Sequence, residues 1–200
     1  MKARFFTDIT CPWAWQSSRW FKKIEEELNI PTTWELFSLA IKNKSSNKSS
    51  EMREKHHKSL RVLRILQAVQ NELSNDNVSS LYTAIGNNFH VKKQTIDSNL
   101  ENILDECGID NKFLENMDNE DLDKMIENST QQAVKLCGND VGVPIIVLND
   151  GKKEKAIFGP IISEVPNLQD SLEMWEHFKY ICFNENIHEL KRERFIPLGL

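Results

Sequence analysis

A short apolar segment, Phe5 to Ile9, runs directly into the motif Cys11-Pro12-Trp13-Ala14-Trp15. Proline is favoured in the first turn of a helix, because the N–H that it lacks would have no partner there. The pattern therefore predicts a buried strand over residues 3–9, followed at once by a helix that carries a thiol at its start. Such a thiol lies near the positive end of the helix dipole, so we expect its pKa to fall below the ~8.5 of a free cysteine.

The helix pattern continues through Trp20, Phe21, Ile24 and Leu28, and Asn29-Ile30-Pro31 ends it. Residues 32–39 are rich in β-formers and read as a second strand. The polar stretch 42–50 has no periodicity and predicts a loop or a domain junction. From there to about Gly138 the apolar spacing is almost entirely helical, and a cap-like pair, Asp118 and Asp121, marks the expected start of the last of these helices.

Strand patterns return at residues 143–148 and 155–158, and Asn149-Asp150-Gly151 between them is a strong hairpin signal. Asn167, with Asp170 three residues later, is expected to cap a final helix. The sequence therefore predicts an α/β layered domain over residues 1–41 and 139–200, interrupted by an all-helical insertion over residues 42–138.

The overall charge and the four cysteines limit the possible functions. A formal net charge of −5 argues against nucleic acid or an anionic membrane as the main partner. No apolar run reaches the length of a membrane span and the chain starts in a strand, so we expect a cytoplasmic protein with reduced thiols. Cys107, Cys137 and Cys182 lack the spacing of a metal site, and we expect them to pack in the core.

This order of elements resembles the thioredoxin fold with the helical insertion of the DsbA-like branch. Val143-Pro144 then corresponds to the cis-proline that this superfamily places opposite its active cysteine. Further motifs narrow the resemblance to the group that includes mycothiol-dependent nitroreductases and related DsbA-family oxidoreductases. They are Cys11-Pro12-Trp13, the segment from Leu81 to His90, Phe158-Gly159-Pro160, Pro166 and Trp175.

The resemblance implies a thiol-disulfide oxidoreductase with Cys11 as its nucleophile and Trp13 as a ring on which a flat substrate stacks. Pro144 and the Val143 backbone would hold the chain of a thiol cofactor in extended pairing. Asn43 corresponds to an asparagine that follows the second strand. His90 corresponds to a pocket histidine, although a satisfied structural histidine is an equal alternative. A tyrosine expected early in the insertion has no counterpart among residues 52–57.

The expected cofactor is a low-molecular-weight thiol, mycothiol first, with glutathione or bacillithiol as alternatives, and no metal. The expected partners are that thiol and a disulfide or electron-poor small molecule, in a monomer or a homodimer. His56-His57 lies in a basic stretch with Arg53, Lys55 and Lys58, which reads first as a solvated helix face. The same stretch is also placed to receive the carboxylates of a thiol cofactor.

Ala14 occupies the position where the group usually has a second, resolving cysteine. Three explanations stay open. A small thiol resolves the Cys11 adduct by a monothiol route, or the protein activates a cofactor's own sulfur, as kappa-class glutathione transferases and the related isomerases do. Alternatively, the alanine replaces a cysteine in a variant made to trap a state. A binding module that has lost turnover is the non-enzymatic reading.

Overall fold

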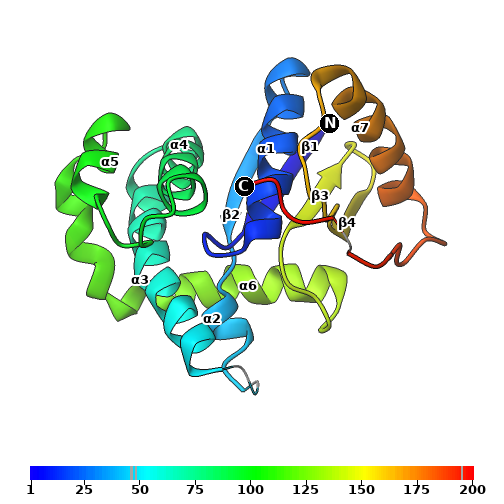
Figure 1. Cartoon of the computed structure of the whole chain (residues 1–200). Coiled ribbons are helices and arrows are strands. Elements are labelled where there is room, and N and C mark those ends of the chain that lie inside the picture. The colour runs from blue at the N-terminus through cyan, green and yellow to red at the C-terminus, as the bar shows by residue number, and fades with distance from the viewer. Residues whose placement is uncertain (46, 48, 195) are drawn as a thin grey trace.

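The computed structural model describes residues 1–45, 47, 49–194 and 196–200, and in this part of the chain one mixed sheet forms the centre (Figure 1). The strand order is β2-β1-β3-β4. β1 (Lys2–Thr7) pairs parallel with β2 (Thr32–Leu36) and antiparallel with β3 (Ile145–Asn149). β3 pairs antiparallel with β4 (Glu154–Phe158), so the hairpin predicted at residues 149–151 is confirmed.

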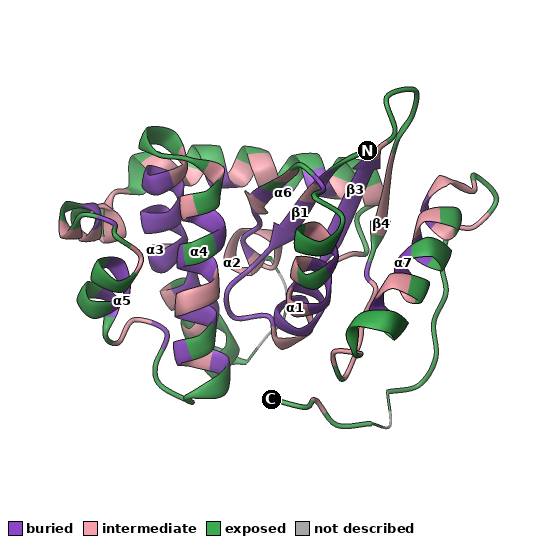
Figure 2. Cartoon of the chain, turned by 90° about the horizontal axis from the view of Figure 1, so that it is seen from above, coloured by how far each residue is buried: buried purple, intermediate pink, exposed green. Residues whose placement is uncertain are grey.

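The alternation of side chains along β1 divides the core into two layers. Phe5 lies on the face covered by α1 (Pro12–Glu27) and α7 (Leu168–Phe183), where both Phe5 and Trp20 are fully buried. Phe6 points to the opposite face, where it shares a cluster with Cys11, Ala14 and Ala133 of α6 (Asp123–Cys137). Figure 2 shows the buried strands between α6 and α1. The predicted α/β class with a helical insertion is confirmed.

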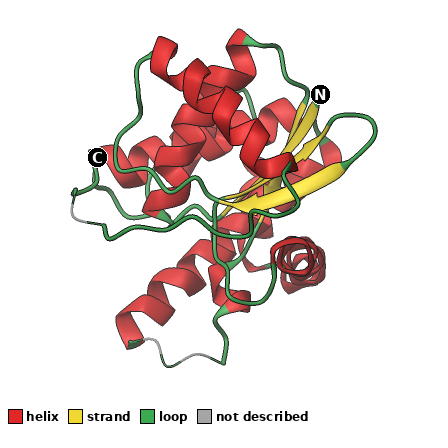
Figure 3. Ribbon diagram, turned by 90° about the vertical axis from the view of Figure 1, so that its right-hand side faces the viewer, coloured by secondary structure: helices red, strands yellow, loops and turns green. Residues whose placement is uncertain are grey.

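Among the described residues, the regular elements between β2 and β3 are all helical. Figure 3 shows the helices in red around the yellow sheet. The α-helices between β2 and α6 are α2 (Leu39–Lys42), α3 (Ser50–Glu72), α4 (Asn75–Gly86) and α5 (Leu100–Glu106). A π-helical turn (Asn87–Val91) follows α4, and two 3-10 segments (Asn111–Asp118, Glu120–Leu122) precede α6. The domain division at residue 138 stays a prediction. α6 lies inside the predicted insertion, yet it packs against the sheet.

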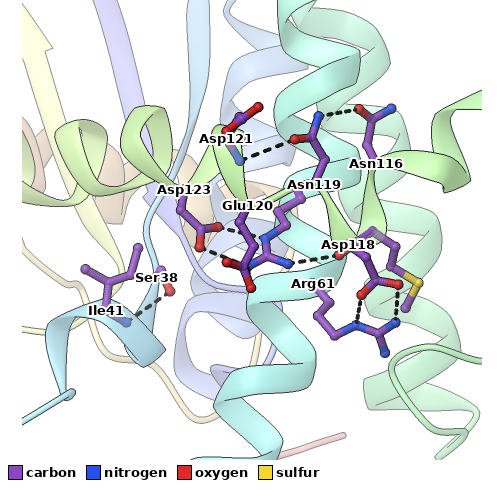
Figure 4. A network of polar contacts seen from close by, with 11 residues as sticks. Ser38, Ile41, Arg61, Asn116, Asp118, Asn119, Glu120, Asp121 and Asp123 are labelled. Carbon is purple, nitrogen blue, oxygen red and sulfur yellow. Dashed lines mark hydrogen bonds and ion pairs between the residues drawn. The ribbon is translucent and has the colours of Figure 1, made fainter.

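Two arginines of α3 tie the first 3-10 segment and the start of α6 to α3 (Figure 4). Arg61 makes a bidentate contact with Asp118 at 2.8 and 3.0 Å. The buried Arg64 holds Asp123 in the same way at 2.7 and 2.9 Å. The prediction that Asp118 and Asp121 start the last helix is therefore wrong: Asp118 is taken by Arg61, and the Asn119 side chain accepts the Asp121 N–H instead.

Close contact between α1 and α4 explains why a glycine ends α4. Trp15 is buried, and its ring lies against the Gly86 backbone. A Cβ atom at Gly86 would lie 3.0 Å from the Trp15 Cη2 atom and closer still to two other ring atoms. Because real Cβ atoms do not approach rings this closely, any side chain here must displace the indole.

We expect Gly86→Ala to lower the free energy of unfolding by about 1–3 kcal/mol, because overpacking outweighs the gain in helix propensity. The measurement is urea unfolding. Gly142→Ala is the matched control, since among the described residues, its two chain neighbours aside, the single atom within 4 Å of such a Cβ is Leu39 Cδ2 at 3.9 Å. Equal effects of the two substitutions would contradict the packing explanation.

Candidate active site at the start of α1

Cys11 forms the N-cap of α1, and its sulfur makes two contacts with the backbone. The residue is extended (φ −81°, ψ 110°), and Sγ accepts the Ala14 N–H at 3.5 Å. The thiol donates in turn to the Val143 carbonyl oxygen at 3.4 Å. Only 9% of the residue is exposed. The sulfur thus lies between the free N–H groups of a helix and the chain segment that precedes Pro144.

The peptide bond between Val143 and Pro144 is cis, as the family resemblance implied. The Gly159 N–H donates to the Pro144 carbonyl at 2.9 Å, which ties this turn to the end of β4. A second cis bond, Gly159-Pro160, directly follows β4 and was not expected from the sequence. Both cis-proline turns lie beside α1, since its N-cap Cys11 bonds Val143 and the Ser17 hydroxyl donates to the Pro160 carbonyl.

The expectation of a lowered pKa at Cys11 is wrong for this arrangement. The pKa of Cys11 is raised to about 11, chiefly by burial and in smaller part by the negative charge of Asp8. The N–H groups of Ala14 and Trp13 and the positive charge of Lys55 lower this pKa, but they do not offset burial. The helix start therefore favours the thiolate as predicted, whereas the closed surroundings of the sulfur favour the thiol.

Asp8 is a fully buried carboxylate that the sequence reasoning did not single out. Its Oδ1 accepts the Thr10 N–H at 2.8 Å, the Thr10 hydroxyl at 2.6 Å and the Ser59 hydroxyl at 2.8 Å. Its Oδ2 accepts the Leu39 N–H at 2.8 Å. One side chain thus joins the cysteine turn, the start of α2 and helix α3. The available signal was an acidic residue at the end of an otherwise apolar strand, three positions before Cys11.

His90 contacts the backbone of the segment that leads into Cys11. Its Nε2–H donates to the Ile9 carbonyl at 2.7 Å, and its ring stacks on Trp15 with centroids 5.4 Å apart. Phe89 packs edge-on against the same ring at 4.8 Å. Burial lowers the pKa of His90 to about 4, and the nearby charges of Lys55, Lys93 and Arg19 lower it too. A neutral histidine with these contacts fits the structural alternative, and its role as a pocket residue stays a prediction.

The other predicted residues lie at the start of α1 and at the end of α2. Pro12 and the half-buried Trp13 begin α1, and the Arg194 guanidinium lies 4.9 Å from the centre of the Trp13 ring. Ala14 is fully buried behind the sulfur. Asn43 ends α2, where its N–H donates to the Leu39 carbonyl at 3.0 Å. Functional roles for Trp13 and Asn43 stay predictions.

The remaining cysteines lie away from the motif in the sequence, and all four are free thiols. Cys107 and Cys137 are half-buried and Cys182 is buried, in keeping with core packing. Burial raises the pKa of Cys137 to about 11 and that of Cys182 to about 12. Within the described residues, no group of three His, Cys, Asp or Glu side chains is placed to hold a metal, and no helix is long and apolar enough to cross a membrane.

The basic stretch of α3 differs from its predicted solvated face in one respect. His57 is exposed, but His56 is buried and Lys55 is half-buried with its ammonium group over Phe89. Lys55 is also the residue of this stretch whose charge affects the pKa of Cys11. The sequence located the basic stretch, and only the packing distinguishes its buried and half-buried members from the exposed His57.

A cysteine at a helix N-cap, facing a cis-proline in a sheet with a helical insertion, defines a DsbA-like thiol oxidoreductase with a thioredoxin fold. The chain belongs to the Rv2466c-like family, described as mycothiol-dependent nitroreductase Rv2466c, whose model matches residues 10–192. Over 193 residues it is 24% identical to the uncharacterized protein Rv2286c of Mycobacterium tuberculosis, covering 95% of this chain and 81% of that protein.

Solved structures of low sequence identity share the fold. The cytosolic disulfide reductase DsbM from Pseudomonas aeruginosa matches with a TM-score of 0.60 at 12% identity, over 90% of this chain and 100% of that one. A 2-hydroxychromene-2-carboxylate isomerase matches with a TM-score of 0.63 at 14% identity, over 90% of this chain and 95% of that one. These similarities establish the architecture of the chain and leave the choice between reductase and isomerase chemistry to its own residues.

The lowered pKa of His90 predicts a pH-dependent stability. An unfolded chain protonates this histidine below about pH 6.5, whereas the folded protein resists protonation until about pH 4. The stabilisation is therefore complete above about pH 6.5 and is lost as the pH falls to about 4, by up to about 3 kcal/mol. Urea unfolding across this range measures it. His90→Gln should flatten the slope while the control His177→Gln, at an exposed site, keeps it; a wild-type slope in His90→Gln would refute the assignment.

Proposed function

We propose that this protein is a monothiol reductase in which Cys11 attacks a disulfide or another electron-poor small molecule, and a low-molecular-weight thiol resolves the adduct. The supporting observation is that Cys11 faces the cis Val143-Pro144 bond with alanine at the position of a second sulfur. Mycothiol is the first candidate for the thiol, because the family carries its name. Glutathione and bacillithiol are the alternatives, in a reducing cytoplasmic setting.

The two exchange steps balance without a second cysteine. The Cys11 thiolate attacks one sulfur of the substrate, a Cys11–sulfur bond forms, and the other sulfur leaves with the electron pair of the broken bond. The thiolate of the small thiol then attacks the mixed disulfide and releases Cys11. For a nitroaromatic substrate, two thiols become a disulfide and supply two electrons, while the nitro group becomes a nitroso group and one oxygen leaves as water.

Cys11 must lose its proton before it can attack, and the Val143 carbonyl provides the means of control. In the structure, the Val143 carbonyl oxygen accepts the hydrogen bond of the Cys11 thiol. If the extended chain of an incoming thiol pairs with the Val143 backbone, it competes for that carbonyl. The sulfur then keeps the N–H groups of Ala14 and Trp13, which favour the thiolate. Substrate binding and activation of the nucleophile are thereby coupled.

The alternative of an isomerase or transferase, in which the cofactor's own sulfur reacts, is favoured by one observation. A Cys11 whose pKa is about 11 is a poor nucleophile at neutral pH. In that case Cys11 would serve only as a hydrogen-bond donor to a bound thiol. The two mechanisms differ in whether a covalent adduct forms on Cys11.

We expect incubation with the symmetric disulfide of mycothiol, and in parallel with that of glutathione, to add the mass of one thiol at Cys11. Intact-mass analysis and peptide mapping measure the adduct. Cys11→Ser should remove it, and Cys107→Ser, at a half-buried position, is the matched control that should keep it. Ala14→Cys should prevent its accumulation, because the new thiol resolves it. Full thiol-dependent reductase activity in Cys11→Ser would refute the proposed function.

A further inference from the structure

Lys55 of α3 connects through two aromatic rings to the turn that carries Cys11. Its Nζ lies 5.1 Å from the centre of the Phe89 ring, a cation–π distance. The Phe89 ring packs edge-on against the His90 ring, with ring centres 4.8 Å apart. His90 in turn donates to the carbonyl of Ile9, two residues before Cys11. The charge of Lys55 acts on the Cys11 sulfur directly as well. The half-buried Lys55 is therefore held over the aromatic rings that contact the cysteine turn.

A second cation reaches the motif from the other end of the chain. The Arg194 guanidinium lies 4.9 Å from the centre of the Trp13 ring. The chain end beyond it is fixed to α1 and its neighbouring loop: the Gln16 side chain donates to the Gly199 carbonyl at 2.6 Å, and the Gly199 N–H donates to the Ser163 carbonyl at 2.9 Å. In Figure 1 the red C-terminal segment runs back to α1.

Neither cation forms an ion pair within the part of the chain that the structure describes. Lys58, one turn from Lys55 on α3, differs in this respect, because its Nζ lies 3.7 Å from Glu54. Asp8 is the acidic group whose charge reaches Cys11, but four donors already occupy its oxygens. Two cations seated on aromatic rings are thus available to an anionic group that a ligand brings in.

We propose that Lys55 and Arg194 give this site a preference for electrophiles that carry a carboxylate, such as an aromatic disulfide dicarboxylate. This inference rests on the proposed function, in that the Cys11 thiolate attacks the disulfide. The new bond joins Cys11 to one sulfur, the old sulfur–sulfur bond breaks, and the leaving aromatic thiolate takes the electron pair. The cations attract the carboxylate of the reagent, and their rings hold them in place for it.

The test compares stoichiometric reaction rates of the full-length protein with two aromatic disulfides, the dianionic dithiobis(nitrobenzoate) and the uncharged dithiodipyridine. Both release a coloured thiol, and the rate seen in Cys11→Ser is subtracted as background from the other cysteines. Both reactions need the same Cys11 thiolate, so the ratio of their rate constants is independent of the pKa of Cys11. We expect Lys55→Gln and Arg194→Gln each to lower this ratio by about threefold, and added salt to lower it in the wild type.

Lys58→Gln is the matched control and should leave the ratio unchanged. A ratio unaltered in Lys55→Gln and Arg194→Gln would overturn the inference. Equal losses with both reagents would also overturn it, because they would show that the cations act only through the protonation of Cys11. Absence of Cys11 reaction with either reagent would overturn this inference alone, because the proposed function is decided separately by the adduct that the disulfide of mycothiol or glutathione forms on Cys11.

Discussion

The set of hydrogen bonds to Asp8 is the constraint on which the active-site region depends. A fully buried carboxylate is costly unless donors surround it, and here four donors come from three separate segments. The Thr10 pair shapes the turn before Cys11, the Leu39 N–H fixes the start of α2, and Ser59 fixes α3. The helical insertion is thereby attached to the sheet close to the turn that carries Cys11, and Lys55 lies on the same helix as Ser59.

The same arrangement has a consequence for reactivity. Asp8 and the closed packing raise the pKa of Cys11, while the helix N–H groups and Lys55 lower it. Burial is the largest of these effects, so the unliganded site stores a protonated thiol bonded to Val143. A lone cysteine gains from this protection, because it has no neighbouring thiol that could rescue an oxidised sulfur. In the proposed mechanism, the reactivity of Cys11 then depends on a ligand that takes over the Val143 carbonyl.

Much of this could be predicted from the sequence, for identifiable reasons. The strand that runs into Cys11-Pro12, the hairpin at residues 149–151 and the Asn167 cap are local signals, and the structure contains all three. The sign of the pKa shift at Cys11 could not be predicted, since burial by Val143 and the sheet is a property of packing between distant segments. For the same reason the roles of Asp8, Gly86 and Arg194 emerge only when α3, α4 and the C-terminal segment are in place.

The most direct test of the central claim is the pH dependence of Cys11 alkylation by iodoacetamide, measured with and without a bound thiol whose sulfur is methylated and therefore unreactive. The account predicts an apparent pKa near 11 for Cys11 in the free protein, and a fall of at least about one unit when the analogue occupies the Val143 backbone. Peptide mapping assigns the alkylation to Cys11. A low pKa in the free protein, or a value that the analogue leaves unchanged, would contradict the account.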